Sequence, residues 1–116
     1  MVIQDCAENG EFDPRKIVEL LHTSSGEFAR TLGLGKDAFQ IKEPIASERT
    51  QHRIRQMVEV LSKIEPRLGS AIVAYAWYRS EPIPGYAGQT AMELVQSGRA
   101  EDVLAFIDAV NAGVHA

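Results

Sequence analysis

Few residues of this chain have the types and spacing of a catalytic or metal site. Cys6 and a distant histidine would make a nucleophile and its base, but no residue near Cys6 supports such a pair. His22, His52 and His115 do not share metal-ligand spacing with one another or with Cys6. We therefore expect neither nucleophilic catalysis nor a zinc site.

Two other motifs lack the parts that their chemistry requires. Glu101 and Asp102 are adjacent, so on a helix their carboxylates point in different directions and make a poor acid–base pair. The Gly33-Leu34-Gly35 turn lacks the preceding strand and the further glycine of a phosphate-binding loop. We therefore expect a binding protein without a cofactor rather than an enzyme.

Positive charge gathers in one stretch of the sequence, whose basic residues are Lys42, Arg49, His52, Arg53 and Arg55. Contacts with nucleic-acid phosphates need such charge on a rigid element, although Glu43 and Glu48 partly offset it here. The alternative is an ordinary solvated helix face. A net charge of −4 argues against a strongly basic coat protein but is compatible with a local basic face.

The segment before this stretch, residues 25–41, fits a helix-turn-helix. Ala29 is small where two helices would cross, Gly33 would make the turn, and Phe39 is apolar where the second helix would meet the core. Lys42 stands where an apolar residue is expected, and Pro44 shortens the second helix. Helices joined by a glycine turn are also common in proteins that bind no DNA. The residues predicted to face DNA are Lys36, Gln40, Lys42, Arg49, His52, Arg53 and Arg55.

Capping residues and helical periodicity predict an all-α chain of about seven helices. Helix starts are expected at Asp13-Pro14, at Ser24 with a capping box to Glu27, at Ser47, at Ser70 and at Thr90 with a capping box to Glu93. A short helix is also expected over residues 36–41, and a last one begins near Glu101. Pro66 is expected to end the long helix at Glu65. Gly98 and Gly113 are expected to end the last two helices.

Two segments are expected at opposite extremes of burial. Residues 1–12 are polar and acidic, which predicts a loose leader with a mobile Cys6 thiol. Residues 71–77 are apolar nearly all round, which predicts the most buried helix, with Trp77 in the core.

Tyr78 and Tyr86 border a loop rich in proline and glycine, where we expect a contact surface. No signal peptide or membrane span is expected, so the cytoplasm is the expected location.

The last part of the chain carries a longer pattern. Its features are Ala76-Trp77, a loop with Pro82, Pro84, Gly85 and Gly88, Thr90-Ala91 leading to Leu94-Val95, Gly98, and an ending from Ile107-Asp108 to Gly113-Val114. From about Glu48 to Ala116 the chain resembles the C-terminal toxin-binding domain of the Xre/MbcA/ParS-type antitoxins. Members of that family usually carry an Xre-like helix-turn-helix upstream, where residues 25–41 lie. The implied division is a leader (1–12), a degenerate helix-turn-helix region (13–46), and a toxin-binding domain (47–116) joined to it through the long helix.

The resemblance implies an antitoxin of a type II toxin–antitoxin system. Its partner would be a RES-domain toxin that consumes NAD⁺, and the antitoxin would keep substrate from the toxin's active site. The complex would repress its own operon by binding operator DNA, with the antitoxin self-associating as a homodimer or in a larger complex with the toxin. The alternative is a small helix-turn-helix regulator without a toxin partner. The residues implied in toxin contact are Tyr86, Gly88, Asp108, Asn111, Gly113, Val114, His115 and Ala116.

Overall fold

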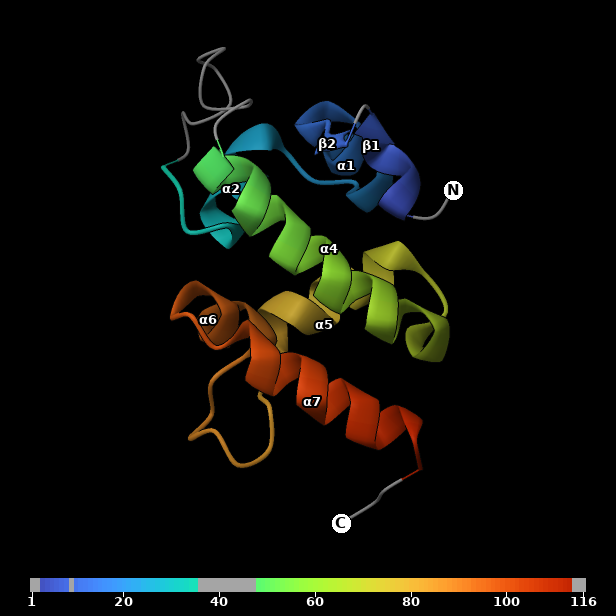
Figure 1. The fold of residues 1–116 in the computed structure, drawn as a ribbon, viewed down its shortest axis with the longest axis vertical. Helices are drawn as coiled ribbons and strands as arrows, with labels where there is room; N and C mark the ends of the chain where they lie inside the picture. Colours follow the sequence, from blue (N-terminus) through green and yellow to red (C-terminus); the bar gives the residue numbers. More distant parts are fainter. Residues whose placement is uncertain (1–2, 9, 36–47, 114–116) are drawn as a thin grey trace.

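The computed structural model describes residues 3–8, 10–35 and 48–113, and this part of the chain is mostly helical (Figure 1). It contains six α-helices: α1 (Pro14–Leu21), α2 (Ser25–Thr31), α4 (Glu48–Leu68), α5 (Ala71–Ser80), α6 (Ala91–Gln96) and α7 (Ala100–Asn111). The helical class agrees with the prediction. The short helix expected over residues 36–41 lies outside the described residues.

Helix α4 is the central element. Figure 1 shows it running across the molecule, with the N-terminal elements on one side and α6 and α7 on the other. Several other elements pack against it, so it buries residues on more than one side. Its buried apolar residues are Ile54, Met57, Val58, Val60, Leu61 and Ile64. One hydrophobic cluster includes these residues and extends from Ile3 to Ile107, so the described parts of the chain share a core.

Helix α4 does not end at Glu65, as Pro66 led us to expect. It continues to Leu68, with Pro66 inside its last turn. Proline has a φ that suits a helix and removes only one N–H donor. The helical bond from the Gly69 N–H to the Glu65 carbonyl, three residues later, still forms at 2.8 Å. The helix ends where Gly69 takes a φ of 98°, a conformation that glycine adopts without strain.

The expected loose leader is instead packed on α4. A 3₁₀ helix (Ile3–Cys6) leads into two short antiparallel strands, β1 (Ala7–Glu8) and β2 (Glu11–Phe12). Ile3 is 1% exposed and Cys6 is fully buried, so the prediction of a mobile thiol was wrong. The Gln51 side chain of α4 fixes β2 by accepting a hydrogen bond from the Phe12 N–H at 2.8 Å and donating one to its carbonyl at 2.9 Å. These tertiary contacts have no signature in the local sequence.

Helix α5 is not the most buried helix. It buries one face, formed by Ala71, Ala74, Tyr75 and Tyr78, whereas Ile72 and Val73 on the other side are 41% and 48% exposed. Trp77 is partly buried against the core. Tyr78, expected at a contact surface, is 1% exposed. The error arose because an apolar composition does not show which sides of a helix receive neighbours.

Most predicted caps form as expected. The side chains of Asp13, Ser24, Ser70 and Thr90 accept hydrogen bonds from the first turns of α1, α2, α5 and α6. The Thr90–Glu93 capping box is complete. At α2 only the Ser24 half is seen, because Glu27 pairs with Arg30 at 3.0 Å. Within the described ranges, no helix is both long and apolar enough to cross a membrane.

Candidate functional site

The loop between α5 and α6 has a defined backbone. Ile83, which is 1% exposed, anchors it in the core, and the Ile83 N–H donates to the Gln89 carbonyl at 2.8 Å. Pro82 and Thr90 form a bridge at its base. Ala87 and Gly88 then take φ values of 55° and 81°, which turn the chain sharply. The loop therefore offers an exposed rim on a fixed base; the rim consists of Pro84, Gly85, Ala87 and Gly88.

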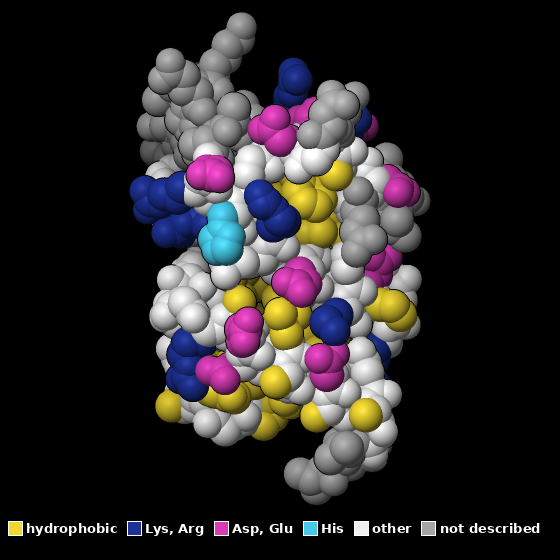
Figure 2. All heavy atoms as spheres, in the orientation of Figure 1, with side chains coloured by type: hydrophobic (Ala, Val, Ile, Leu, Met, Phe, Trp, Pro, Cys, Tyr) yellow, Lys and Arg dark blue, Asp and Glu magenta, His cyan; other side chains and the backbone are white. Residues whose placement is uncertain are grey.

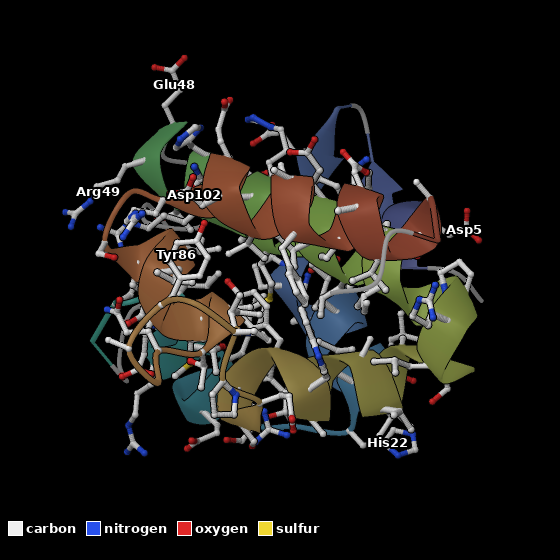
Figure 3. The ribbon with its side chains drawn as sticks, turned by 90° about the horizontal axis from the view of Figure 1, so that it is seen from below. Asp5, His22, Glu48, Arg49, Tyr86 and Asp102 are labelled. Carbon is white, nitrogen blue, oxygen red and sulfur yellow. The ribbon has the colours of Figure 1, made fainter. Side chains whose placement is uncertain are left out.

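Tyr86 joins this loop to the start of α7. Its N–H donates to the Ile83 carbonyl at 3.2 Å, and the Arg99 guanidinium lies over its ring, 5.0 Å from the centroid. Arg99 also pairs with Asp102 in the first turn of α7, at 2.8 Å. Figure 3 shows Tyr86 and Asp102 close together at this end of the molecule. The loop and the beginning of α7 thus form one surface, which contains Tyr86 and Gly88.

Asp108 and Asn111, also implied in toxin contact, have partners within the chain. Asp108 accepts a hydrogen bond from the Lys63 ammonium at 2.7 Å, and Asn111 accepts one from the Arg67 Nε at 3.2 Å. Arg67 also donates to the Val110 carbonyl at 2.9 Å. Both side chains therefore fasten the end of α7 to α4.

The C-terminal residues implied in toxin contact are only partly described. Gly113 is exposed and has a φ of 78°, and its N–H donates to the Val110 carbonyl at 3.1 Å. Val114, His115 and Ala116 lie outside the described residues.

The residues predicted to face DNA do not all lie on one described surface. Arg49, His52 and Arg55 are exposed and recur every three residues, so they share one face of α4. Figure 3 shows Arg49 pointing outward. On the face drawn in Figure 2, basic and acidic side chains lie interspersed. Lys36, Gln40 and Lys42 lie outside the described residues.

Arg53 is the exception in this basic stretch. It is half-buried, and its guanidinium donates a hydrogen bond of 2.6 Å to the Leu32 carbonyl at the end of α2. Gln96 of α6 donates to the two preceding carbonyls, those of Arg30 at 3.1 Å and Thr31 at 2.9 Å. Two side chains from outside α2 thus bond to the carbonyls at its end, of which that of Arg30 also accepts from the Gly33 N–H at 2.9 Å. Neither role was predicted from the sequence.

Gly33 allows Arg53 to approach this closely. A Cβ atom at Gly33 would lie 2.6 Å from the nearer terminal nitrogen of the guanidinium, and the φ of 76° also disfavours any other residue. The prediction that Gly33 makes a turn is confirmed, and its lack of a side chain has this second consequence.

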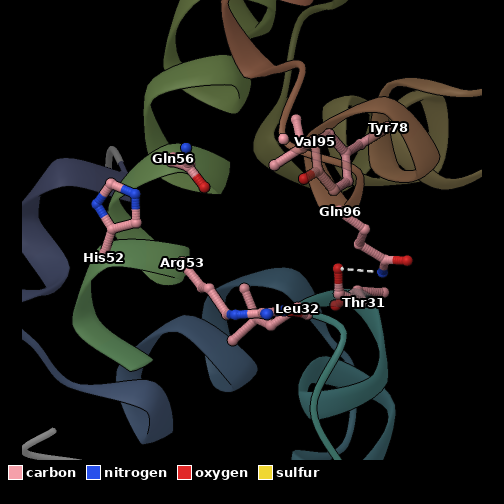
Figure 4. Close-up of a pocket in the computed structure, with 9 residues that line it drawn as sticks. Thr31, Leu32, His52, Arg53, Gln56, Tyr78, Val95 and Gln96 are labelled. Carbon is pink, nitrogen blue, oxygen red and sulfur yellow. Dashed lines mark hydrogen bonds between the residues drawn. The ribbon is translucent and has the colours of Figure 1, made fainter. Parts of the chain in front are cut away.

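A pocket of about 200 Å³ opens beside Arg53 (Figure 4). It lies between α2, α4, α5 and α6, and its polar lining includes His52, Arg53, Gln56, Tyr78 and Gln96. The pocket could not be predicted from the sequence, because its walls come from four separate helices.

The two buried tyrosines of α5 differ in the hydrogen bonding of their hydroxyls. The Tyr75 hydroxyl shares a hydrogen bond of 3.2 Å with the Thr31 hydroxyl. The Tyr78 hydroxyl has no hydrogen-bond partner among the described residues, and Tyr78 lines the pocket. Burial, with a smaller contribution from Tyr75, raises the pKa of Tyr78 well above its ordinary value. Tyr78 therefore stays a neutral hydrogen-bond donor at physiological pH.

The described residues contain no group of histidine, cysteine and carboxylate side chains that could hold a metal ion. Comparison with known proteins finds no matching family model, no similar curated protein and no similar solved structure. Function is therefore inferred from the residues and geometry of this chain.

Proposed function

We propose that this chain is an antitoxin of the Xre/MbcA/ParS type that binds a RES-domain toxin and blocks NAD⁺ from the toxin's active site. The sequence pattern from Ala76 to Val114 suggests this partner. The observation that carries the proposal is the exposed rim of the loop between α5 and α6, held on a base anchored by Ile83 and joined to α7 through Tyr86 and Arg99.

A fixed loop suits a protein interface because little conformational entropy is lost when it binds. The rim has small or rigid residues, which let a partner's backbone approach closely. Lys63 and Arg67 hold α7 at a set position beside this surface. Asp108 and Asn111 then contribute to toxin binding by orienting α7, and the rim and the residues after Asn111 make the direct contacts.

Operator binding is proposed as the second activity. Arg49, His52 and Arg55 support it, because they are exposed on one face of a helix that the core holds rigidly. A homodimer would place two such faces on successive turns of DNA. A DNA-binding regulator without a toxin partner is the second candidate, and the same three side chains favour it.

Co-expression with a RES-domain toxin encoded beside this chain tests the toxin proposal. Two variants probe the surface: Pro84→Arg, which adds a long charged side chain to the exposed rim, and deletion of residues 114–116. We expect the original chain to co-purify with the toxin and restore growth, and both variants to do so less well. Glu19→Arg, a matched change at an exposed position of α1, is the control and should behave like the original.

Two outcomes would contradict different parts of the proposal. If the original chain neither binds the toxin nor restores growth, the antitoxin function is wrong. If both variants protect as fully as the original, the function stands but the contact surface lies elsewhere.

A further inference from the structure

The pocket beside Arg53 has the chemistry of a ligand site, and nothing in toxin or DNA binding requires it. It is walled by α2 on one side, α4 on another, and α5 and α6 on the third. Its volume of about 200 Å³ exceeds the roughly 150 Å³ of an engineered cavity that takes up benzene. A molecule of that size class fits inside.

The positive charge of the pocket lining favours binding of an anion. Arg53 brings a permanent positive charge, and no aspartate or glutamate is among the residues that line the pocket. One terminal nitrogen of Arg53 is bonded to the Leu32 carbonyl, whereas the other terminal nitrogen and Nε have no hydrogen-bond partner in the described structure. A planar carboxylate is the group that such a guanidinium edge binds through two parallel bonds.

Tyr78 gives the pocket a second polar group, an uncharged hydrogen-bond donor. Its side chain is 1% exposed, yet its hydroxyl has no hydrogen bond to any described residue. Figure 4 shows the hydroxyl directed into the pocket that Arg53 and Gln56 also line. The hydroxyl is accessible from the pocket, because among the described residues the only buried side-chain oxygen or nitrogen without a partner is the Ser62 Oγ. A ligand oxygen in the pocket could therefore accept a hydrogen bond from it.

The remaining walls suit an apolar body. Leu32 of the turn after α2 and Val95 of α6 line the pocket, and both are buried core residues. We propose that this pocket binds a small organic carboxylate, with the carboxylate between Arg53 and Tyr78 and a compact apolar group against Leu32 and Val95. The proposal is independent of the antitoxin function.

Benzoate is the probe, because it combines one carboxylate with one ring of suitable size. Heteronuclear NMR titration of the full chain should show saturable shifts for the amides of residues 31–34 and 95–98. Benzamide, which has the same shape without the charge, should bind at least about tenfold more weakly. Equal binding of the two compounds, or no saturable shift with benzoate throughout the millimolar range, would overturn the proposal and leave a water-filled pocket.

Tyr78→Phe is the decisive variant, because it removes only a hydroxyl that bonds to no other described residue. The variant should fold at least as stably as the original and bind benzoate about tenfold more weakly. Arg15→Ala removes an exposed arginine of α1 whose side chain is 89% exposed, and it should leave benzoate affinity unchanged. Benzoate affinity that is the same in Tyr78→Phe, or that falls equally in Arg15→Ala, would overturn the proposed site.

Discussion

Neighbouring arginines on α4 have different roles. Arg55 extends into solvent, whereas Arg53, two residues earlier, folds back on the carbonyl of Leu32. The difference follows from helical geometry, because residues two apart point to different sides of a helix. Basic residues that are contiguous in the sequence therefore do not form one binding surface.

The Arg53→Ala variant should be measurably less stable than the original. It leaves the Leu32 carbonyl without its 2.6 Å hydrogen bond, and removing the charged partner of such a group costs about 1–3 kcal/mol. Arg55→Ala is the matched control, and a change at an exposed site is expected to stay within about 0.5 kcal/mol. Urea unfolding of both variants measures the difference. Equal free energies of unfolding would show that the hydrogen bond has no net effect.

The exposed basic residues should affect the salt dependence of DNA binding. If Arg49 and Arg55 contact phosphates, replacing both by alanine lowers the affinity for operator DNA and reduces the slope of log K against log salt by about 0.9 per lost contact. Fluorescence anisotropy at several salt concentrations measures the slope. Lys16→Ala on α1 is a control for the loss of positive charge. An unchanged slope in the double variant would exclude this face of α4 from the interface.

Cys6 makes stability sensitive to alkaline pH. Burial raises the pKa of its thiol above the ordinary 9.0; Lys16 lowers it, and Asp5 and Asp13 add to the increase. Because the pKa is higher in the folded state, the neutral thiol's contribution is complete below pH 9 and is lost as the pH rises through the folded-state pKa. The pKa of Tyr78 is also raised by burial, so ionisation of its hydroxyl lowers the free energy of unfolding at still higher pH.

We therefore expect the free energy of unfolding to fall from about pH 9 upward. The Cys6→Ala variant should be less stable at pH 7, since it removes buried volume, but should lose less stability between pH 8 and pH 10. Denaturant unfolding over that range tests both statements. A pH profile of Cys6→Ala parallel to that of the original would rule out the thiol as the titrating group.

Helix α7 depends on side chains of α4 at its end. Arg67 donates to both Asn111 and the Val110 carbonyl, whereas Lys63 makes a single exposed ion pair with Asp108. Exposed ion pairs contribute only about 0–1 kcal/mol, so Arg67 should matter more than Lys63. A surface that α7 presents to a partner would depend on this attachment.

Hydrogen exchange can measure the attachment directly. In Arg67→Ala we expect faster amide exchange over residues 108–113, because the last turn loses two hydrogen bonds to α4. Lys63→Ala should change exchange there much less. Exchange that is equally fast in both variants would show that the ion pair is as important as the Arg67 contacts.

Across the whole molecule, structural features that depend on residues close in the sequence were predicted well, whereas features that depend on long-range contacts were not. Asp13, Ser24 and Thr90 identified helix starts, because a cap acts on backbone groups within a few residues. The docking of Cys6 and the one-sided burial of α5 could not be predicted, since they depend on neighbours distant in the sequence.

The candidate site shows the same division. The turns at Gly88 and Gly98 were readable from composition, and both residues have positive φ values. The bond between Lys63 and Asp108 joins residues 45 apart, and no pattern in either helix specifies it. Likewise, the pocket beside Arg53 exists only once four helices have assembled.

The hydrogen bonds from Gln96 to the last carbonyls of α2 also bear on how the chain folds during synthesis. The Thr31 carbonyl accepts this hydrogen bond from a residue 65 positions further along the chain. A ribosome must therefore add these residues before the end of α2 can gain the bond. We expect the last carbonyls of α2 to stay open to water on the growing chain until α6 has been made and has packed against them.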